Sequence, residues 1–392
     1  MIMKRMALIN ISELPWSEER RRNQAIFQKL VTNENIFDLG VYVNPPKYSN
    51  DSFWKYERIK AISSVSSVKK IQKSITVISP DFSLPFSFKK SMAKLLATKI
   101  MKTAVKEIGD RKYVLWINNA GHHMYHIAKK LMKCSGNVII DLSDDWLTYD
   151  RNGSVQSERK ARLDDLINNS DIMIAVNDHV ASKYRHKNTI VFNNATDYKI
   201  FRDSTEIYHM QDYFPKPADR IYIGFIGGLH RGRVDEDLLY RLFQEFKEYT
   251  FIFVGHSNDN RLIETISRFQ NVKFIHTVPY NILPSIIKSF DVAIVPHLIN
   301  EHTRGNDLLK VLDYMAAGVP VVTTNCSNVK KYDNALYIAD NHQEFIQYVR
   351  GLASGTVHHD SDAGYEVAQT FSWDRTVPEL EMMISKKLNL SN

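Results

Sequence analysis

The sequence predicts an α/β protein with two doubly wound domains, each built on a parallel sheet. The chain is 392 residues long, which is more than one hydrophobic core usually organises. Short runs of β-branched and other apolar residues recur along it, with helical stretches between them. Most runs are continuous rather than alternating, as is typical of parallel strands buried on both faces. Because the strand–helix series runs once through each half, the sequence predicts this arrangement twice over.

The apolar runs give the expected strands in order. In the first half they are residues 6–11, 39–43, 75–79, 113–117, 138–141, 171–176 and 189–192. In the second half they are residues 221–226, 250–254, 272–275, 291–295, 319–323 and 335–338. The join is expected in the polar stretch 203–219, so the domains are predicted at 1–202 and 203–370. Residues 371–392 have the pattern of a terminal amphipathic helix able to cap either domain.

The composition excludes several classes of protein. Apolar residues make up 44% of the chain and charged residues 24%, which is ordinary globular usage. Cys134 and Cys326 cannot form a disulfide framework or a four-cysteine zinc site, so we expect a cytoplasmic protein. No run approaches the roughly 18 apolar residues of a membrane span. The first apolar run, residues 6–11, is too short for a secretion signal.

The net charge of +7 is unevenly distributed. Residues 1–200 hold 32 Lys and Arg against 20 Asp and Glu, a net charge of +12. Residues 201–392 hold 19 against 24, a net charge of −5. The first half is therefore expected to face an anionic partner, for which nucleic acid, a membrane surface and a phosphorylated substrate all qualify.

The strongest motif is a polar loop, a helix, a glycine stop and a buried strand at residues 303–323. Lys310 and Asp313 are three positions apart in it, so they share one face of the helix. The helix N-terminus suits a phosphate, Lys310 adds a positive charge, and Asp313 is able to accept hydrogen bonds from a ribose. The alternative is a surface ion pair between these two side chains.

The whole string resembles the donor motif of GT-B glycosyltransferases, in which Lys-x-x-acidic-Tyr-x-Ala-x-Gly-x-Pro-Val-Val holds the sugar nucleotide. It is most similar to the family 4-like enzymes of teichuronic acid and exopolysaccharide synthesis. The resemblance implies two Rossmann-like domains that face a cleft, and a closing helix at 371–392 that crosses back to the first domain. It also implies that Lys310 contacts the diphosphate and Asp313 the ribose.

Further segments extend the resemblance over nearly the whole chain. Asn194-Ala195-Thr196-Asp197 resembles the family's Asn-Gly-Val-Asp segment near the interdomain hinge. The implied donor site takes its remaining residues from the loop after the strand 221–226, from the base-binding loop and from the start of the motif: Gly227, Gly228, Arg231, Tyr280, Thr303 and Asn306. Retaining members usually carry a glutamate eight positions before the site of Asp313, where this chain has Gly305. The stereochemistry of transfer therefore stays open.

Two polar clusters follow strands of the first half. Asp144 and Asp145 come after the strand 138–141. Adjacent carboxylates at a strand end raise one another's pKa, so one of them is able to act as a general base. A similar aspartate is the base of the inverting xanthan-type glucuronosyltransferases, so we predict Asp144 first and Asp145 second; the alternative is a helix N-cap. His122 follows the strand 113–117 and is expected to contact the donor or acceptor sugar, with a plain loop histidine as the alternative.

A basic helix is predicted over residues 89–106, where Lys99, Lys102 and Lys106 form one stripe beside an apolar face. A basic amphipathic helix suits an anionic membrane, and related enzymes act on lipid-linked acceptors at the inner leaflet. The alternative is an ordinary helix with its apolar face on the core.

These observations predict a glycosyltransferase that moves a sugar, hexosyl or glucuronosyl, from a nucleotide donor, with UDP as first choice, to a glycan or lipid-linked acceptor. We expect no cofactor and no metal, and a peripheral position on the inner face of the plasma membrane. A sugar-nucleotide epimerase on the same fold is the alternative enzyme. A nucleic-acid-binding protein lacks a supporting motif, and a dehydrogenase lacks the Gly-x-Gly-x-x-Gly turn.

Overall fold

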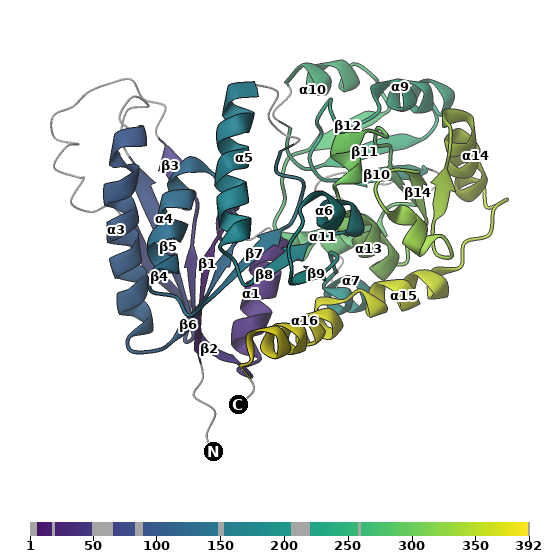
Figure 1. Ribbon diagram of the computed structural model, residues 1–392. Coiled ribbons are helices and arrows are strands. Elements are labelled where there is room, and N and C mark those ends of the chain that lie inside the picture. The colour runs from purple at the N-terminus through teal and green to yellow at the C-terminus, as the bar shows by residue number, and fades with distance from the viewer. Residues whose placement is uncertain are drawn as a thin grey trace. The chain divides into compact units, whose positions relative to one another are not determined.

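The computed structural model describes residues 6–17, 20–48, 66–82, 89–147, 153–204, 220–257 and 260–390. The chain divides into two compact units. Unit 1 is made of Met1–Phe192 and Val377–Asn392, and unit 2 is Asn193–Thr376. Each unit is described by itself below, with the labels of Figure 1.

Unit 1 is built on a mainly parallel sheet. Its described strands lie in the order β3-β5-β2-β1-β6-β7-β8-β9, and β4 pairs with β5. The strands are β1 (Met6–Ile11), β2 (Phe37–Val43), β3 (Lys47–Tyr48), β4 (Ser66–Gln72), β5 (Ile75–Phe82), β6 (Tyr113–Ile117), β7 (Asn137–Leu142), β8 (Ile172–Ala175) and β9 (Thr189–Val191). Every pairing is parallel except β4 with β5, which is antiparallel.

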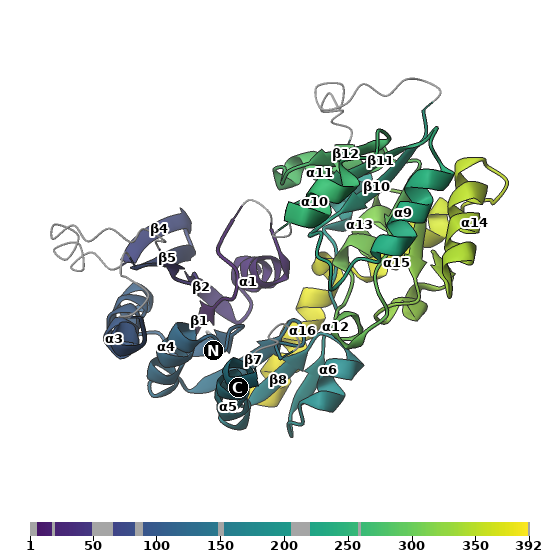
Figure 2. The ribbon, with the colours of Figure 1, turned by 90° about the horizontal axis from the view of Figure 1, so that it is seen from above.

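Helices cover both faces of this sheet. They are α1 (Arg22–Thr32), α3 (Lys89–Ile108), α4 (His122–Met132), α5 (Gly153–Asn168) and α6 (Asp178–Lys183). Figure 2 shows α3 and α4 on one side of the strands and α1 on the other. The apolar residues of α3, α4 and α5 join the strands in one core. On the opposite face, Gly40 allows α1 to approach β2, because a Cβ there would stand 2.5 Å from the ring of Phe27.

Unit 2 has a six-stranded parallel sheet in the order β12-β11-β10-β13-β14-β15. The strands are β10 (Tyr222–Ile226), β11 (Thr250–Val254), β12 (Val272–Ile275), β13 (Val292–Val295), β14 (Val321–Thr324) and β15 (Tyr337–Ala339). The helices are α7 (Tyr198–Asp203), α9 (Glu236–Glu245), α10 (Asn260–Ile266), η3 (Tyr280–Ile282), α11 (Leu283–Lys288), α12 (Glu301–Arg304), α13 (Leu309–Ala316), η4 (Val329–Tyr332), α14 (His342–Ala353) and α15 (Ser361–Thr370).

The four inner strands of unit 2, β10, β11, β13 and β14, are buried on both faces, which explains their continuous apolar runs. Residues of α11, α13 and α15 form one core with the sheet, and residues of α9, α10 and α14 form the other. Side chains cap the helices on the second face, since Asp235 accepts the amide of Leu238 at the start of α9 and Asn341 that of Glu344 at the start of α14.

The last helix, α16 (Trp373–Leu388), begins in unit 2, and its residues from Val377 onward group with unit 1. The contacts divide the chain at Phe192 and Asn193, ten residues before the boundary predicted from the sequence at 202 and 203. The earlier division has a local cause, because the amide of Thr196 donates to Phe371 and the amide of Trp373 donates to Thr196, which ties that segment into unit 2. Residues 205–219, where the join was expected, lie outside the described residues.

Candidate functional site

Lys310 stands in the first turn of α13 with its ammonium group inside unit 2. Its Nζ lies 4.0 Å from the centroid of the Phe225 ring. A Cβ on Gly227 would stand 2.8 Å from this Nζ, and the φ of Gly227 is +127°, so only glycine suits the position. Burial, helped by the charge of Arg233, lowers the pKa of Lys310 to about 7. Within the described part of the chain Lys310 has no hydrogen bond or ion pair, and a buried cation without a counter-ion favours an anionic ligand.

Other cationic and imidazole groups surround Lys310. Arg233 approaches His302, with 3.3 Å between Nη2 and Nε2, and the Arg233 Nε is buried with no hydrogen-bond partner among the described residues. His297 is 1% exposed, and burial together with the charges of Lys310 and Arg233 holds its pKa well below the usual value. These side chains follow β10 and β13, at the carboxyl ends of parallel strands, where α/β sheets bind ligands.

The loop after β10 differs in detail from the predicted site. Arg231 is 43% exposed and its Nε lies 3.3 Å from Glu236, whereas Arg233 is the arginine that acts on the pKa of Lys310. The sequence analysis missed Arg233, because Arg231 and Arg233 lie in the same loop and the sequence does not show which of them acts on Lys310. Gly228 lies where a Cβ would come within 2.8 Å of His230 Nε2, which keeps the loop close to that ring.

Asp313 lies on the same helix but does not pair with Lys310, so the alternative of a surface ion pair between them is wrong. Asp313 is 7% exposed, and it accepts a hydrogen bond of 2.6 Å from the hydroxyl of Thr196. Burial raises the pKa of Asp313 to about 8, the nearby charge of Asp197 adds to the shift, and the Thr196 hydrogen bond opposes it. The helix therefore presents one cation and one carboxyl in separate surroundings.

Hydrogen bonds hold the loop before α13 against the segment that carries Thr196. The Asp307 carboxylate accepts the amide of Asn194 at 2.6 Å, and the side-chain amide of Asn194 donates back to the Asp307 carbonyl at 2.7 Å. Lys331 pairs with the other carboxylate oxygen at 2.8 Å. This clamp places Thr196 beside Asp313, a contact for which the sequence offers no signal.

The remaining predicted donor residues have assigned partners within unit 2. The hydroxyl of Tyr280 donates to Asp197 at 3.0 Å. Thr303 is 1% exposed and forms a capping box with Asn300 at the start of α12, so its hydroxyl serves the helix end. Asn306 is 7% exposed, and its carbonyl accepts a hydrogen bond from Ser327.

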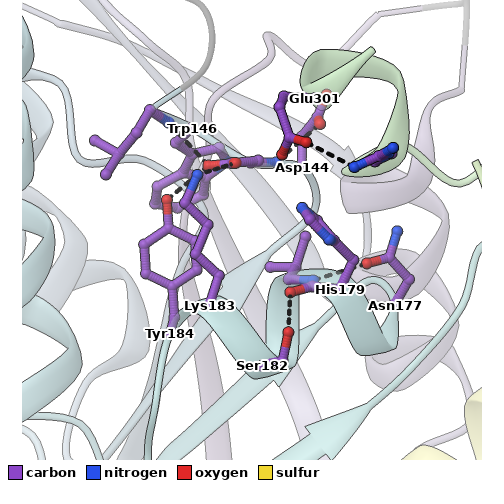
Figure 3. A network of polar contacts seen from close by, with 12 residues as sticks. Asp144, Trp146, Asn177, His179, Ser182, Lys183, Tyr184 and Glu301 are labelled. Atoms are coloured by element: carbon purple, nitrogen blue, oxygen red, sulfur yellow. Dashed lines mark hydrogen bonds and ion pairs between the residues drawn. The ribbon is translucent and has the colours of Figure 1, made fainter. Parts of the chain in front are cut away.

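Asp145 is an anchor in unit 1. Its side chain is 1% exposed, and it accepts hydrogen bonds from Lys183, from the hydroxyl of Tyr184 at 2.6 Å and from the amide of Leu147 at 3.2 Å. In Figure 3 the polar ends of Lys183 and Tyr184 lie together beside Trp146. These three donors hold the Asp145 carboxylate in place inside unit 1.

Asp144 is half-buried, and its Oδ1 accepts the amide of Asp145 at 2.8 Å. A second carboxyl, which the sequence analysis missed, interacts with it: Glu13, just after β1. Burial raises the pKa of Glu13 to about 7, the charge of Asp144 adds to the shift, and Arg159 opposes it. Its position after the first strand was the only signal, and a single glutamate in a turn is too common to stand out.

His122 begins α4 with Gly121 as the N-cap residue. Its ring lies edge-on to His123 at 5.4 Å and to His126 at 4.8 Å. Burial lowers the pKa of His126, and the charges of Lys94 and Arg162 add to the shift. No group of three His, Cys, Asp or Glu in the described ranges is arranged to hold a metal ion.

The basic helix is α3, and its apolar side faces the core. Leu96, Ile100, Ala104 and Ile108 belong to the core of unit 1, as the alternative interpretation of this helix proposed. Lys102 and Lys106 are exposed and Lys99 is half-exposed. None of the described helices is both long and apolar enough to cross a membrane.

Comparisons with known proteins give matches for part of the sequence and for the whole fold. Residues 220–354 match the model of the family described as Glycosyl transferases group 1. TuaH of Bacillus subtilis (strain 168), whose name describes a teichuronic acid biosynthesis glycosyltransferase, is 26% identical over 113 residues. That match spans only 28% of this chain and 28% of TuaH.

Solved structures match nearly the whole chain. Sucrose-phosphate synthase from Thermosynechococcus elongatus has a TM-score of 0.72 at 13% identity and covers 99% of this chain and 100% of its own. Anabaena HepE in complex with UDP and glucose has a TM-score of 0.68 at 15% identity, with 98% and 99% covered. The predicted GT-B fold is confirmed, and the family match confirms the predicted resemblance to glycosyltransferases.

Proposed function

We propose that this protein, whose residues 220–354 belong to Glycosyl transferases group 1, transfers a sugar from a UDP-sugar to a hydroxyl of a lipid-linked or growing bacterial surface polysaccharide. The observation that carries the proposal is the half-buried ammonium group of Lys310, which has no anionic partner among the described residues. A nucleoside diphosphate supplies that anion, and Arg233 adds a second cation beside it.

The chemistry follows from where charge develops. In transfer the acceptor oxygen forms a bond to the sugar C1, while the bond from C1 to the diphosphate oxygen breaks and its electron pair leaves with the nucleoside diphosphate. Lys310 and Arg233 stabilise that developing charge as the leaving group departs. Asp313 would bind the ribose hydroxyls, which favour its ionised form.

Inversion at C1 fits the residues present. Gly305 stands where retaining relatives have a glutamate, so unit 2 offers no side chain there. Unit 1 offers carboxyl groups after β1 and β7, one of which takes the proton of the acceptor hydroxyl as a general base. Of the two aspartates predicted for this role, Asp145 is engaged by three donors, so Asp144 is the stronger of that pair.

The choice of uridine is supported by HepE, whose structures hold UDP, UDP with glucose, or UDP-glucose. A thermal-shift screen against UDP, GDP and dTDP tests it. We expect UDP to raise Tm by several degrees in the wild type and in the exposed control Lys247→Ala, and to have no effect on Lys310→Met. An equal response of Lys310→Met and the wild type would contradict the proposed site. Conversion of the donor without an acceptor would indicate an epimerase instead.

The lipid-linked acceptor and the membrane are supported by charge. Residues 1–200 carry a net +12, and Lys102 and Lys106 project from α3 into solvent. Because the apolar face of α3 is in the core, binding would be electrostatic rather than by insertion, and each lysine near an anionic leaflet contributes roughly 1 kcal/mol.

Liposome co-sedimentation tests the membrane proposal. The triple variant Lys99→Glu, Lys102→Glu and Lys106→Glu should lose salt-sensitive binding to vesicles that contain phosphatidylglycerol. A matched triple variant in unit 2, Lys247→Glu, Lys273→Glu and Lys330→Glu, has the same change in charge and should still bind. Equal binding by both triple variants, or binding that ignores lipid charge, would rule out a role for α3.

A further inference from the structure

The turn after β1 brings an unassigned carboxyl group to the same sheet edge as Asp144. Strands β1, β6 and β7 are adjacent and parallel, with Ile11 paired to Ile117 and Ile117 paired to Ile140. Glu13 lies two residues beyond the end of β1, and Asp144 two residues beyond the end of β7. Both residues therefore leave the sheet at its carboxyl edge, on either side of β6.

The surroundings of Glu13 are unusual for a glutamate in a turn. Glu13 is half-buried, and the charged groups that act on its carboxyl group are Asp144, after β7, and Arg159, on α5. Among the described residues Glu13 has neither a hydrogen bond nor an ion pair. Partial burial of a carboxyl group without a hydrogen bond costs stability, and groups held in this way are common at functional sites.

The turn that carries Glu13 is held firmly. The hydroxyls of Ser12 and Tyr42 share a hydrogen bond of 2.5 Å, and they lie 2.8 Å and 3.0 Å from the carbonyl oxygen of Leu14, to which the other proton is donated. The side-chain amide of Asn119, after β6, donates to the carbonyl of Ser12 at 3.3 Å. Glu13 lies between Ser12 and Leu14, whose carbonyl groups both accept these hydrogen bonds. Its backbone is therefore preorganised, as a catalytic group requires.

The two carboxyl groups differ in what they accept. Asp144 receives the amide of Asp145 at 2.8 Å, which stabilises its ionised form. Glu13 receives no such bond and faces the negative charge of Asp144. The raised pKa of Glu13, about 7, suits a group that accepts a proton near neutral pH, where a general base is most effective.

We propose that Glu13 is the catalytic base of this transferase and that Asp144 is a positioning residue that acts through it. The inference rests on the proposed function. The Glu13 carboxylate takes the proton of the acceptor hydroxyl as the acceptor oxygen bonds to the sugar C1. The C1–oxygen bond to the diphosphate breaks, the electron pair leaves with the nucleoside diphosphate, and the proton on Glu13 later passes to solvent.

Hydrolysis of UDP-glucose, with water as the acceptor, measures the effect without a purified glycan. We expect kcat of the wild type at saturating UDP-glucose, where the bound diphosphate keeps Lys310 charged, to rise with pH around an inflection near 7 and then level off. Glu13→Gln should lower kcat by roughly 100-fold or more and remove the inflection, while UDP binding is unchanged. Asp144→Asn should lower kcat less than tenfold and move the inflection to lower pH, because the like charge beside Glu13 is gone.

The outcomes separate the two proposals. A wild type that binds no UDP-sugar contradicts the proposed function. A wild type that turns over, while Glu13→Gln keeps its rate or Asp144→Asn alone loses both rate and inflection, overturns only the assignment of Glu13. Denaturant unfolding checks the fold: Glu13→Gln should be more stable than the wild type above pH 7 and equal to it near pH 4, and the control Glu107→Gln should show no such gain.

Discussion

Lys310 makes donor binding depend on protons. Its pKa in the folded protein is about 7, against a usual 10.5, so without a bound anion the group is mostly neutral at pH 8. A bound diphosphate favours the charged form, so binding should take up close to one proton at pH 8, and affinity should fall as pH rises above 7. Calorimetry in buffers of different ionisation enthalpy measures the uptake. Lys310→Met should abolish it, and uptake that survives in this variant would contradict the role of Lys310.

Lys310 also makes the stability of the fold depend on pH, and here the effect is opposite to that on affinity: stability rises with pH. Because folding lowers the pKa of Lys310, the unfolded chain binds more protons between pH 7 and 10.5, and the free energy of unfolding should gain from this group as pH rises through that window. The charged ammonium group is therefore tolerated in the fold below pH 7 at the expense of stability, as expected of a binding residue.

Thr196 affects the pKa of the neighbouring Asp313 carboxyl group. Among the described residues its hydroxyl is the only hydrogen-bond donor to the Asp313 carboxyl group, and that hydrogen bond opposes the upward shift of the Asp313 pKa. Thr196→Val keeps the shape but removes the donor, so we expect the Kd for UDP at pH 7 to rise about fivefold to tenfold. Thr196→Ser should restore most of the affinity. Isothermal titration gives both values, and a Kd within twofold of the wild type in Thr196→Val would dismiss this contact.

At the scale of elements, the loop before α13 depends on one buried carboxylate. The Asp307 side chain is 1% exposed and pairs with Lys331, which is 20% exposed. Asp307→Asn leaves Lys331 without its partner and weakens the hold on Asn194, so it should destabilise unit 2 by about 2–3 kcal/mol. The control Glu301→Gln breaks an exposed pair with Arg304 and should change stability by less than about 0.5 kcal/mol. Urea unfolding compares the two, and equal effects would refute the clamp.

The sequence predicted most of the elements, because buried parallel strands produce continuous apolar runs. Strands β1, β6, β11 and β12 have the predicted bounds, and the others differ by one to three residues at their ends. Two described strands were missed, β3 and β4. The first has only two residues, and the second, Ser66–Gln72, is an exposed polar strand that pairs only with β5.

The site was predictable only in part. Lys310 and Asp313 stand out because they belong to one helix with a long, specific motif. Arg233, Thr196 and Glu13 act on other residues across the fold, at sequence separations that no local pattern encodes. Asp145 was chosen with Asp144 as a pair of adjacent carboxylates, whereas folding directs one to Lys183 and Tyr184 and the other to the turn.

At the scale of the whole molecule, the last helix completes unit 1. Val377, Leu380 and Ile384 of α16 are fully buried, and Glu381 accepts hydrogen bonds from Asn35 at 3.0 Å and from the amide of Ile36 at 3.2 Å. All of these partners belong to unit 1. The resemblance implied such a crossing helix. The sequence gives no signal, however, that the buried Glu381 carboxylate attaches this helix to the residues just before β2.

A core substitution in α16 should therefore weaken unit 1. Leu380→Ala should lower its stability by about 2–4 kcal/mol, whereas Met382→Ala, at a residue 66% exposed, should have little effect. Hydrogen exchange followed by mass spectrometry resolves the two units. We expect faster exchange in β1 and β2 of Leu380→Ala and no change in β10 and β11. Faster exchange confined to unit 2 would contradict the assignment of α16.

Unit 1 is made of two separate segments of the chain, and this affects the order in which the two units complete their cores during synthesis on the ribosome. Unit 2 is one continuous segment, Asn193–Thr376, and can close its core as soon as that segment has emerged. Unit 1 is translated first but lacks Val377, Leu380 and Ile384 until the whole of unit 2 has been made. The apolar surface that these residues cover stays open for that interval, so the nascent chain is most exposed to chaperones, and to aggregation, in the unit that begins it.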